Sequence, residues 1–398
     1  MARRQERYGD NNDFYTYTVK NCIFERFPKA EVEYAFKCRS KGVNLLPFAD
    51  RIQGKLNEHR GLSIPAHTIS LLRSKRYLSQ PYLDDLGHYR LNPDYIEVGE
   101  KDGHLDIRVR GPWYQTIDWE VPILEMVNEA YFEELDTPAV RAEGERRLTE
   151  KIEFMRHYME HDRKRFPQHH DPVIVEMGTR RAFATDWHGH VIERLTTELP
   201  QLVTGTSNVH WGELHGVNLI GTMSHQGPMA MQALYPLHLS QKVWLTTWND
   251  VFRGDLGYAL SDTLGTKMFL RDFDLALAKV YDGPRQDSGD PFKWGREILD
   301  HYRTLGIDPY TKTGTWSDSL NAKKYFDIWE SFAGEIRSVG GIGTWFSNDM
   351  GIEPLSIVVK MVKCNGLPVA KLSEDIAKAQ CEDESFIAYL KHMVTDLM

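Results

Sequence analysis

The stretch Val173-Ile174-Val175-Glu176-Met177-Gly178-Thr179-Arg180-Arg181 contains the pattern that decides the fold. A short apolar run from Val173 to Met177 is followed at once by a glycine, a hydroxyl group and two cations. A short run of this kind, bounded by such residues, is typical of a buried strand in a parallel sheet. The sequence therefore predicts a strand here whose carboxyl end presents polar groups.

The same pattern recurs along the following 170 or so residues, where apolar runs alternate with helical segments. The further runs are 202–204, 218–220, 258–260, 313–316 and 336–339. Small, hydroxylated or charged residues gather at 205–208, 221–225, 261–263, 285–290, 317–319 and 341–344. This alternation predicts β/α units around a parallel sheet or barrel, with the polar segments meeting at one end of it.

The two ends of the chain carry a different signal. Asp102-Gly103 separates two runs that alternate apolar and polar residues, which predicts a hairpin. Asn365-Gly366 repeats the device after the apolar run 357–364, and Pro368 makes the following strand an edge strand. We therefore expect both ends of the chain to build one domain.

Composition excludes several classes of protein. The 398 residues carry a formal net charge of −9, which disfavours sequence-independent binding of nucleic acid. No apolar stretch is long enough for a membrane span, and the first residues lack the apolar segment of a signal peptide, so we expect a cytoplasmic protein without membrane partners. The spacing of the four cysteines matches neither a zinc ribbon nor a disulfide framework, which predicts reduced thiols.

The polar segments favour a phosphorylated ligand. Glycine lets the backbone approach a ligand closely, and exposed N–H groups and threonine hydroxyls donate to phosphate oxygens. Arg180, Arg181 and Arg285 could form a cationic clamp, while His225 and nearby carboxylates could transfer a proton or stabilise positive charge on a sugar. The alternative is that these Gly-Thr and Ser-Asp pairs only end strands and cap helices.

Several motifs resemble the nicotinate phosphoribosyltransferase family. The resemblance extends over nearly the whole chain, and its most specific parts are Asp287-Ser288-Gly289-Asp290-Pro291 and Gly341-Ile342-Gly343-Thr344. The other matching segments are Asp13-Phe14-Tyr15, Phe36-Lys37-Cys38-Arg39, Gly111-Pro112-Trp113, Glu120-Val121-Pro122 and Cys364 to Ser373.

The resemblance implies an irregular parallel α/β barrel with a second, smaller α+β domain, as in type II phosphoribosyltransferases. We expect the smaller domain to comprise 1–130 joined by 350–398, and the barrel to comprise 131–349. It also implies a homodimer with active sites at the subunit interface.

Residue roles follow from the same resemblance. His225, Asp262 and Asp287 are the expected catalytic residues, and His225 is the histidine that ATP phosphorylates. Tyr15 packs on the pyridine ring, from the neighbouring subunit, and Ser207 and Thr222 lie in the loops around that ring. The expected contacts to anions and to the ribose phosphate are Arg180, Arg285, Asp318, Gly343 and Thr344.

The implied reaction transfers phosphoribosyl from phosphoribosyl diphosphate to nicotinate, in NAD salvage. The expected ligands are nicotinate, phosphoribosyl diphosphate, Mg²⁺ and ATP as co-substrate, with no metal held by protein residues alone. Ser207 stands where nicotinamide-using relatives carry an aspartate, which favours a substrate that bears a carboxylate. A nicotinamide phosphoribosyltransferase remains the alternative.

Three departures from the family pattern motivate another alternative, a non-catalytic ligand sensor on the same fold. Met177 replaces a ring-stacking aromatic residue, Thr16 replaces a lysine, and Gln226 replaces a glutamate found in many bacterial members. A hypothesis of another class rests on His157-Tyr158-Met159-Glu160-His161, which fits the H-x-x-E-H pattern of zinc peptidases.

Overall fold

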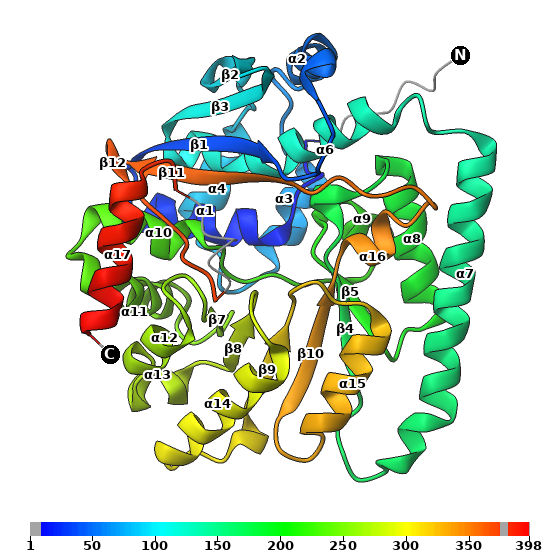
Figure 1. Cartoon of the computed structure of the whole chain (residues 1–398), viewed down its shortest axis with the longest axis vertical. Coiled ribbons are helices and arrows are strands. Elements are labelled where there is room, and N and C mark those ends of the chain that lie inside the picture. Colours follow the sequence, from blue (N-terminus) through cyan, green and yellow to red (C-terminus); the bar gives the residue numbers. More distant parts are fainter. Residues whose placement is uncertain (1–8, 375–380, 398) are drawn as a thin grey trace.

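The computed structural model describes residues 9–374 and 381–397 and contains two separate sheets (Figure 1). The first sheet is antiparallel, in the order β12-β11-β1-β3-β2. Its strands are β1 (Glu31–Cys38), β2 (Ile96–Lys101), β3 (His104–Pro112), β11 (Ile357–Cys364) and β12 (Leu367–Pro368). Because β1 pairs with both β3 and β11, segments from the two ends of the chain lie side by side.

Both predicted hairpins are confirmed. Strands β2 and β3 pair in antiparallel register around Asp102 and Gly103, which have φ values of 53° and 78°. Such positive values are what a tight two-residue hairpin turn requires. Asn365 and Gly366 adopt the same conformation between β11 and β12, and β12, which contains Pro368, is an edge strand.

The second sheet is parallel, in the order β6-β5-β4-β10-β9-β8-β7. Its strands are β4 (Val173–Glu176), β5 (Val203–Thr206), β6 (Asn218–Leu219), β7 (Tyr258–Leu260), β8 (Gly283–Gln286), β9 (Thr313–Trp316) and β10 (Arg337–Ile342). Six of them fall on the predicted apolar runs. The seventh, β8, contains Gly283 and Pro284, so it shows no apolar run.

The predicted fold class is confirmed: a parallel α/β sheet is joined to a smaller α+β part. The sheet is not closed by hydrogen bonds between its edge strands β6 and β7 within the described residues. Instead the Thr222 hydroxyl, in the segment after β6, donates to the carbonyl oxygen of Tyr258 in β7 at 3.2 Å. The domain boundaries near residues 130 and 350 stay predictions, and their terminal spans include residues 1–8, 375–380 and 398, which lie outside the described residues.

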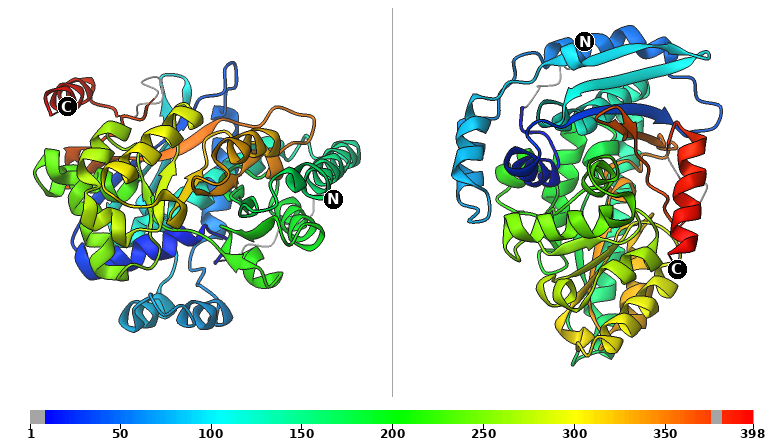
Figure 2. Two further views of the ribbon diagram at one scale, coloured as in Figure 1. Left: turned by 90° about the horizontal axis from the view of Figure 1, so that it is seen from below. Right: turned by 90° about the vertical axis from the view of Figure 1, so that its left-hand side faces the viewer.

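The helices surround the parallel sheet and fill the space between the two sheets (Figures 1 and 2). They are α1 (Phe14–Arg26), α2 (Ala49–Glu58), α3 (Ala66–Arg73), α4 (Gln80–His88), α5 (Trp113–Thr116), α6 (Glu120–Phe132), α7 (Pro138–Glu160), α8 (Thr185–Glu198), α9 (Val209–Leu214), α10 (Gln226–Leu234), α11 (Ser240–Phe252), α12 (Thr266–Asp272), α13 (Leu275–Val280), α14 (Pro291–Thr304), α15 (Ala322–Phe332), α16 (Thr344–Ser347) and α17 (Glu384–Asp396).

One apolar core extends through both parts of the molecule. Trp113, Trp119 and Trp244 are fully buried in it, and helix α6 contacts both β11 and the turn after β4. This packing fixes the antiparallel sheet over the carboxyl ends of the parallel strands. Helices α3 and α4 form a pair that protrudes from the body in the left view of Figure 2. Among the described residues, no helix combines the length and the apolar character needed to cross a membrane.

Candidate active site

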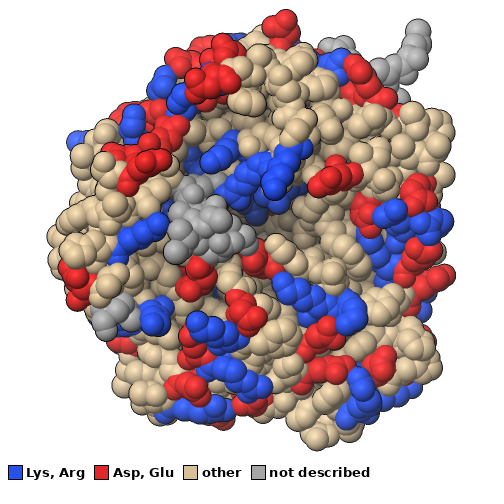
Figure 3. Space-filling view, in the orientation of Figure 1, with Lys and Arg blue, Asp and Glu red and all other residues tan. Residues whose placement is uncertain are grey.

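A cavity of about 480 Å³ lies between the carboxyl ends of the parallel strands and β11. The residues after β4, β8, β9 and β10 line one side, and 354–360 line the other. Its walls carry six cations and three carboxylates: Arg39, Arg180, Arg181, Arg285, Lys360 and Lys371, with Glu120, Asp287 and Asp318. Figure 3 shows blue side chains gathered at a hollow in this region. The excess of positive charge suits a ligand with several negative charges.

A smaller chamber of about 70 Å³ adjoins the large cavity and shares lining residues with it. Arg180, Arg285 and Asp287 belong to both walls. The chamber alone is lined by Tyr15, Ser207, Thr222 and His225, among others, and Met177 also borders both spaces. The arrangement provides a polyanion-binding cavity with a compact side chamber.

The sequence-predicted residues divide between these two spaces. Arg180, Arg285 and Asp287 line both spaces, Asp318, Gly343 and Thr344 line only the large cavity, and Tyr15, Ser207, Thr222 and His225 line only the chamber. Asp262 is 1% exposed and lines neither space, but its carboxylate forms a hydrogen bond with His225.

Tyr15 reaches a chamber of its own chain, and its assignment to the site of a neighbouring subunit stays a prediction. Tyr15 lines the chamber beside His225 of the same chain. Its position follows from α1, whose first residue donates its backbone N–H to the Ser207 carbonyl oxygen at 2.7 Å. The Thr18 hydroxyl, one turn later, lies within 2.6 Å of the carbonyl oxygen of Thr222. Helix α1 is thereby fastened to the loops after β5 and β6.

Buried Glu176, at the end of β4, holds the strand-end loops in place. Its carboxylate accepts the backbone N–H of Gly178 at 2.6 Å and the Thr206 hydroxyl at 2.7 Å. His188 Nε2 lies 2.9 Å from the same carboxylate. Burial alone lowers the pKa of His188, but the adjacent Glu176 outweighs it, so the pKa rises above its ordinary value. Buried hydrogen bonds to the Glu176 carboxylate therefore anchor two of the loops that line the site.

The chamber also contains the carboxylate of Asp13, which lies in a matching segment but for which the sequence predicted no role. The Ser207 hydroxyl donates to Asp13 at 2.7 Å, and Asp13 lies 3.7 Å from Arg180. Glu120 lies 3.6 Å from the same guanidinium. Arg180 thus already lies near two carboxylates of the chamber, so Ser207 is not the only residue that determines the charge there.

His225 is held between an acid and a cation. Its Nε2 lies 2.8 Å from Asp262, whose other oxygen accepts from Ser288 at 2.6 Å. The ammonium group of Lys371 lies 2.8 Å from Asp262 and 3.0 Å from Asp287. Lys371 thus lies between two carboxylates that would otherwise repel each other.

These neighbours determine the protonation of the cluster. Burial and the charge of Lys371 lower the pKa of His225 from 6.5 to about 4, although Asp262 opposes the change. Burial opposes ionisation of Asp262 and Asp287, but Lys371 and the other adjacent cations lower the pKa of both carboxyl groups. At neutral pH the imidazole is therefore neutral beside two ionised carboxylates. With Nε2 donating to Asp262, Nδ1 keeps a lone pair.

Two cations of the large cavity, Arg181 and Lys360, have pKa values below their ordinary ones. Burial and then Arg180 lower the pKa of Arg181 to about 10. Burial lowers the pKa of Lys360, in β11, to about 8, against the attraction of Glu120. A bound polyanion would raise both pKa values again, because a nearby negative charge favours the charged form of each group. Sequence reasoning missed Lys360 altogether, because a lone lysine in a strand gives no local signal.

Gln226 has a structural explanation. Its amide nitrogen donates to Glu120 at 2.8 Å, and its amide oxygen accepts from Tyr34 at 2.7 Å and from Trp113 at 3.2 Å. A glutamate in this place would set a second carboxylate against Glu120. The amide therefore fits the surroundings that this chain provides.

The remaining sequence motifs have simpler roles. Asn208, Asp290 and Asn321 cap α9, α14 and α15, so part of the strand-end polarity serves as helix capping. The rings of His157 and His161 lie close together at the end of α7, with centroids 4.4 Å apart and ring planes tilted by 44°. Within the described ranges they belong to no group of three or more residues able to hold a metal ion, so the peptidase hypothesis gains no support.

Two models of one known family match most of the chain. The model of the nicotinate phosphoribosyltransferase (NAPRTase) N-terminal domain matches residues 11–128, and that of the nicotinate phosphoribosyltransferase (NAPRTase) family matches 173–396. The chain belongs to the nicotinate phosphoribosyltransferase family. Both parts of the fold are thus accounted for by one family.

Individual relatives extend over the same length. Nicotinate phosphoribosyltransferase of Ralstonia pickettii is 41% identical over 387 residues, covering 96% of this chain and 97% of the relative. That of Chromobacterium violaceum is 42% identical, covering 96% and 95%.

Solved structures agree with the computed one. The nicotinate phosphoribosyltransferase of Vibrio cholerae superposes with a TM-score of 0.91 at 34% identity, covering 97% of this chain and 93% of that one. The Porphyromonas gingivalis enzyme gives 0.88 at 30% identity, with 98% and 100% covered. The whole described architecture is therefore that of the family.

Proposed function

We propose that this chain transfers phosphoribosyl from phosphoribosyl diphosphate to nicotinate, releasing diphosphate and nicotinate mononucleotide, as a step of NAD salvage. The observation that carries the proposal is the joining of a cationic cavity to a side chamber at the carboxyl ends of the parallel strands. The names of the relatives support nicotinate as the base.

The large cavity binds the donor. Arg180, Arg285 and Lys360 face the space where several phosphate oxygens would lie, and the loop at Gly343 and Thr344 supplies small groups near the ribose phosphate. As diphosphate leaves C1 of the ribose, positive charge develops on the sugar. Asp287 stabilises that charge, and Lys371 and Arg285 keep its carboxyl group ionised.

The chamber binds the base. Tyr15 and Met177 border the space for the pyridine ring, and Arg180 offers the cation for its carboxylate. A thioether packs favourably on an aromatic ring, so Met177 can take the place of an aromatic residue. The ring nitrogen then attacks C1 as the bond to diphosphate breaks, and the electron pair of that bond leaves with diphosphate.

ATP drives the transfer through His225. The lone pair of Nδ1 attacks the γ-phosphorus of ATP, the bond to the bridging oxygen breaks, and ADP leaves with that electron pair. Asp262 orients the ring and stabilises its developing positive charge. Water later cleaves the phosphorus–nitrogen bond to give inorganic phosphate. This coupling places the enzyme in the ligase class.

Magnesium fits the large cavity better than it fits the His225 cluster, where the ammonium group of Lys371 already lies between the two carboxylates. Asp318 faces the large cavity and would hold the ion together with diphosphate oxygens and water. When bound, Mg²⁺ neutralises charge on the diphosphate.

Two further expectations belong to this proposal. A homodimer with active sites at its interface follows from the resemblance, and light scattering on the purified protein tests it. A cytoplasmic location agrees with a reaction whose substrates are metabolites and ATP.

The decisive assay mixes protein, Mg²⁺, phosphoribosyl diphosphate and nicotinate, with and without ATP. We expect nicotinate mononucleotide in both mixtures and more of it with ATP. Turnover of nicotinamide in preference to nicotinate would overturn the choice of base. Binding of phosphoribosyl diphosphate without release of diphosphate from any base would instead indicate a ligand sensor.

A further inference from the structure

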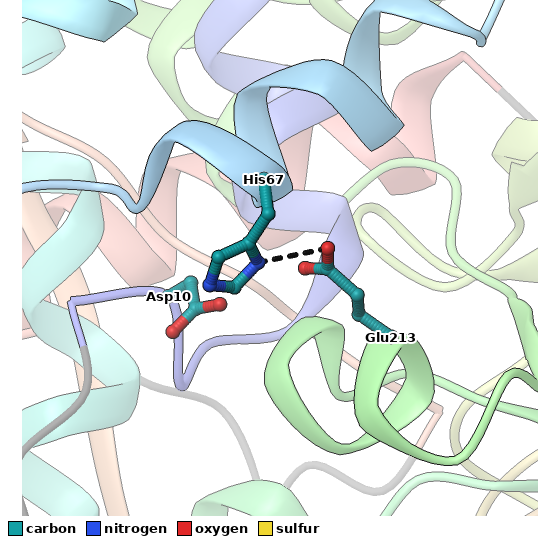
Figure 4. A group of neighbouring side chains, drawn as sticks. All are labelled: Asp10, His67 and Glu213. Atoms are coloured by element: carbon teal, nitrogen blue, oxygen red, sulfur yellow. Dashed lines mark hydrogen bonds and ion pairs between the residues drawn. The ribbon is translucent and has the colours of Figure 1, made fainter.

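A second cluster of carboxylates and histidines lies apart from the residues that line the two cavities. Asp10, His67 and Glu213 approach one another from the segment before α1, from α3 and from α9 (Figure 4). Asp10 is fully buried, Glu213 has 20% of its side chain exposed, and His67 has 67% exposed. The cluster therefore has a buried floor and a side open to solvent.

Its donor atoms are placed as metal ligands are. One oxygen from each carboxylate and one nitrogen of His67 lie within 4.8 Å of one another. Ligands bound to zinc at about 2.0–2.2 Å lie roughly 3.3 Å apart, so the side chains would rotate to bring these atoms closer together on binding. His210 Nδ1 lies 3.2 Å from the other oxygen of Asp10 and orients that carboxylate.

The Thr68 hydroxyl can donate a hydrogen bond to only one of the two carboxylate oxygens beside it. Thr68 Oγ1 lies 2.7 Å from Asp10 Oδ2 and 2.7 Å from Glu213 Oε2. A hydroxyl carries one proton and can donate to only one of the two. One oxygen of Asp10 and one of Glu213 therefore both approach Thr68 Oγ1, and one of them faces a lone pair of that hydroxyl oxygen.

No lysine or arginine of the described ranges forms an ion pair with either carboxylate. The recorded ionic partners are His67 for Glu213 and His210 for Asp10. This differs from the His225 cluster, where Lys371 supplies a cation between two carboxylates. Within the described ranges, the position that Lys371 takes in the His225 cluster is therefore filled by no lysine or arginine in the Asp10 cluster.

We propose that Asp10, His67 and Glu213 bind one divalent transition-metal ion, and that Zn²⁺ suits them best. Two carboxylate oxygens and one imidazole nitrogen match a borderline-soft ion, whereas Mg²⁺ and Ca²⁺ prefer oxygen ligands alone. Water enters the fourth position through the exposed side of His67. The site is independent of the proposed reaction.

The position of the ion gives it a structural role. Asp10 lies three residues before Asp13, which bonds to Ser207 in the chamber, and Glu213 lies on the helix capped by Asn208. His67 lies on the protruding pair of helices, near its contact with α9. The ion therefore ties the segment that leads to Tyr15 to the loop after β5, and it holds α3 against both.

The test uses tag-free, chelator-treated full-length protein and Zn²⁺ in equilibrium dialysis with metal analysis. All variants carry His157→Ala and His161→Ala, because that exposed pair could bind zinc at the surface. We expect one Zn²⁺ per chain in this background and an affinity loss of about 100-fold on adding His67→Ala. His67 is mostly exposed, so its removal leaves the fold intact.

Two readouts make the result unambiguous. Co²⁺ in place of Zn²⁺ should give visible absorption bands that disappear in the His67→Ala and Glu213→Gln proteins. Zn²⁺, but not Mg²⁺, should raise the melting temperature of the background protein and leave that of the His67→Ala protein unchanged. Zinc affinity that His67→Ala does not lower would overturn the proposal, as would the absence of binding at micromolar zinc.

Discussion

Two clusters in this molecule combine histidine with two carboxylates, and they differ in what neutralises the carboxylates. In the active-site cluster the ammonium group of Lys371 lies within 3.0 Å of both Asp262 and Asp287. In the Asp10 cluster the recorded ionic partners are histidines, and a single threonine proton lies between two carboxylate oxygens.

The difference shows that a neighbouring cation changes what a cluster of one histidine and two carboxylates can bind. Lys371 already supplies a cation between the carboxylates of the first cluster, and burial and its charge lower the pKa of His225, which leaves a nitrogen lone pair for the proposed phosphoryl transfer. The second cluster lacks such a cation among the described residues and has an open side. It is suited to bind a metal ion rather than a phosphoryl group.

The largest expected effect comes from removing the active-site imidazole. His225→Ala should abolish ATP stimulation, with the ATP-dependent rate falling by at least about 100-fold, while slow basal transfer continues. The matched variant His67→Ala, in the other cluster, should retain ATP stimulation. Steady-state rates with and without ATP distinguish the two variants. An equal loss of ATP stimulation in both would contradict the different roles given to the two clusters.

Removing the cation between the active-site carboxylates should destabilise the folded protein. Lys371→Met leaves Asp262 and Asp287 facing each other, and we expect the free energy of unfolding to fall by about 3–5 kcal/mol. Lys242→Met is the control, because its partner Asp274 and the lysine are both nearly half exposed. Such surface pairs contribute about 0–1 kcal/mol. Urea unfolding measures both, and similar losses would refute the assigned position of Lys371.

The low pKa of His225 predicts a dependence of stability on pH. The unfolded chain takes up a proton on this histidine near pH 6.5, whereas the folded protein resists protonation until about pH 4. The stabilising contribution is therefore complete above pH 6.5 and is lost progressively as the pH falls toward 4. His225→Asn should flatten the slope of the unfolding free energy against pH in that window. An unchanged slope in His225→Asn would mean that the imidazole titrates normally.

The smallest effect concerns the chamber. Ser207→Asp adds a carboxylate beside Asp13 with no new cation, and we expect the ratio of kcat/KM for nicotinate over nicotinamide to fall about tenfold. Ser207→Ala, which removes the hydrogen bond to Asp13 without adding charge, is the control. A ratio that falls equally in both variants would show that the hydrogen bond, and not charge, sets the preference.

The sequence predicted most of the parallel strands because buried strands produce short apolar runs. It missed β8, whose Gly283 and Pro284 break that pattern, although the polar segment from Arg285 onward indicated a strand end. The two hairpins were predictable because Asp-Gly and Asn-Gly favour one turn conformation.

The site was only partly predictable. Loop residues such as Arg180 and Asp287 were found because they follow strands, but Lys360 lies within β11 and reaches the cavity through the pairing of the two chain ends. The resemblance indicated a role for Tyr15, but no local pattern shows that α1 docks on the loop after β5 and brings Tyr15 to the chamber of its own chain. The Asp10 cluster joins three segments up to 203 residues apart, so no local pattern could reveal it.

The most direct measurement is labelling with ATP that carries ³²P in the γ position, followed by mapping of the modified residue. We expect acid-labile label on His225 in the unaltered protein and in His67→Ala, and none in His225→Ala. Label on another residue, or label that persists in His225→Ala, would contradict the assignment of His225 as the phosphoryl acceptor.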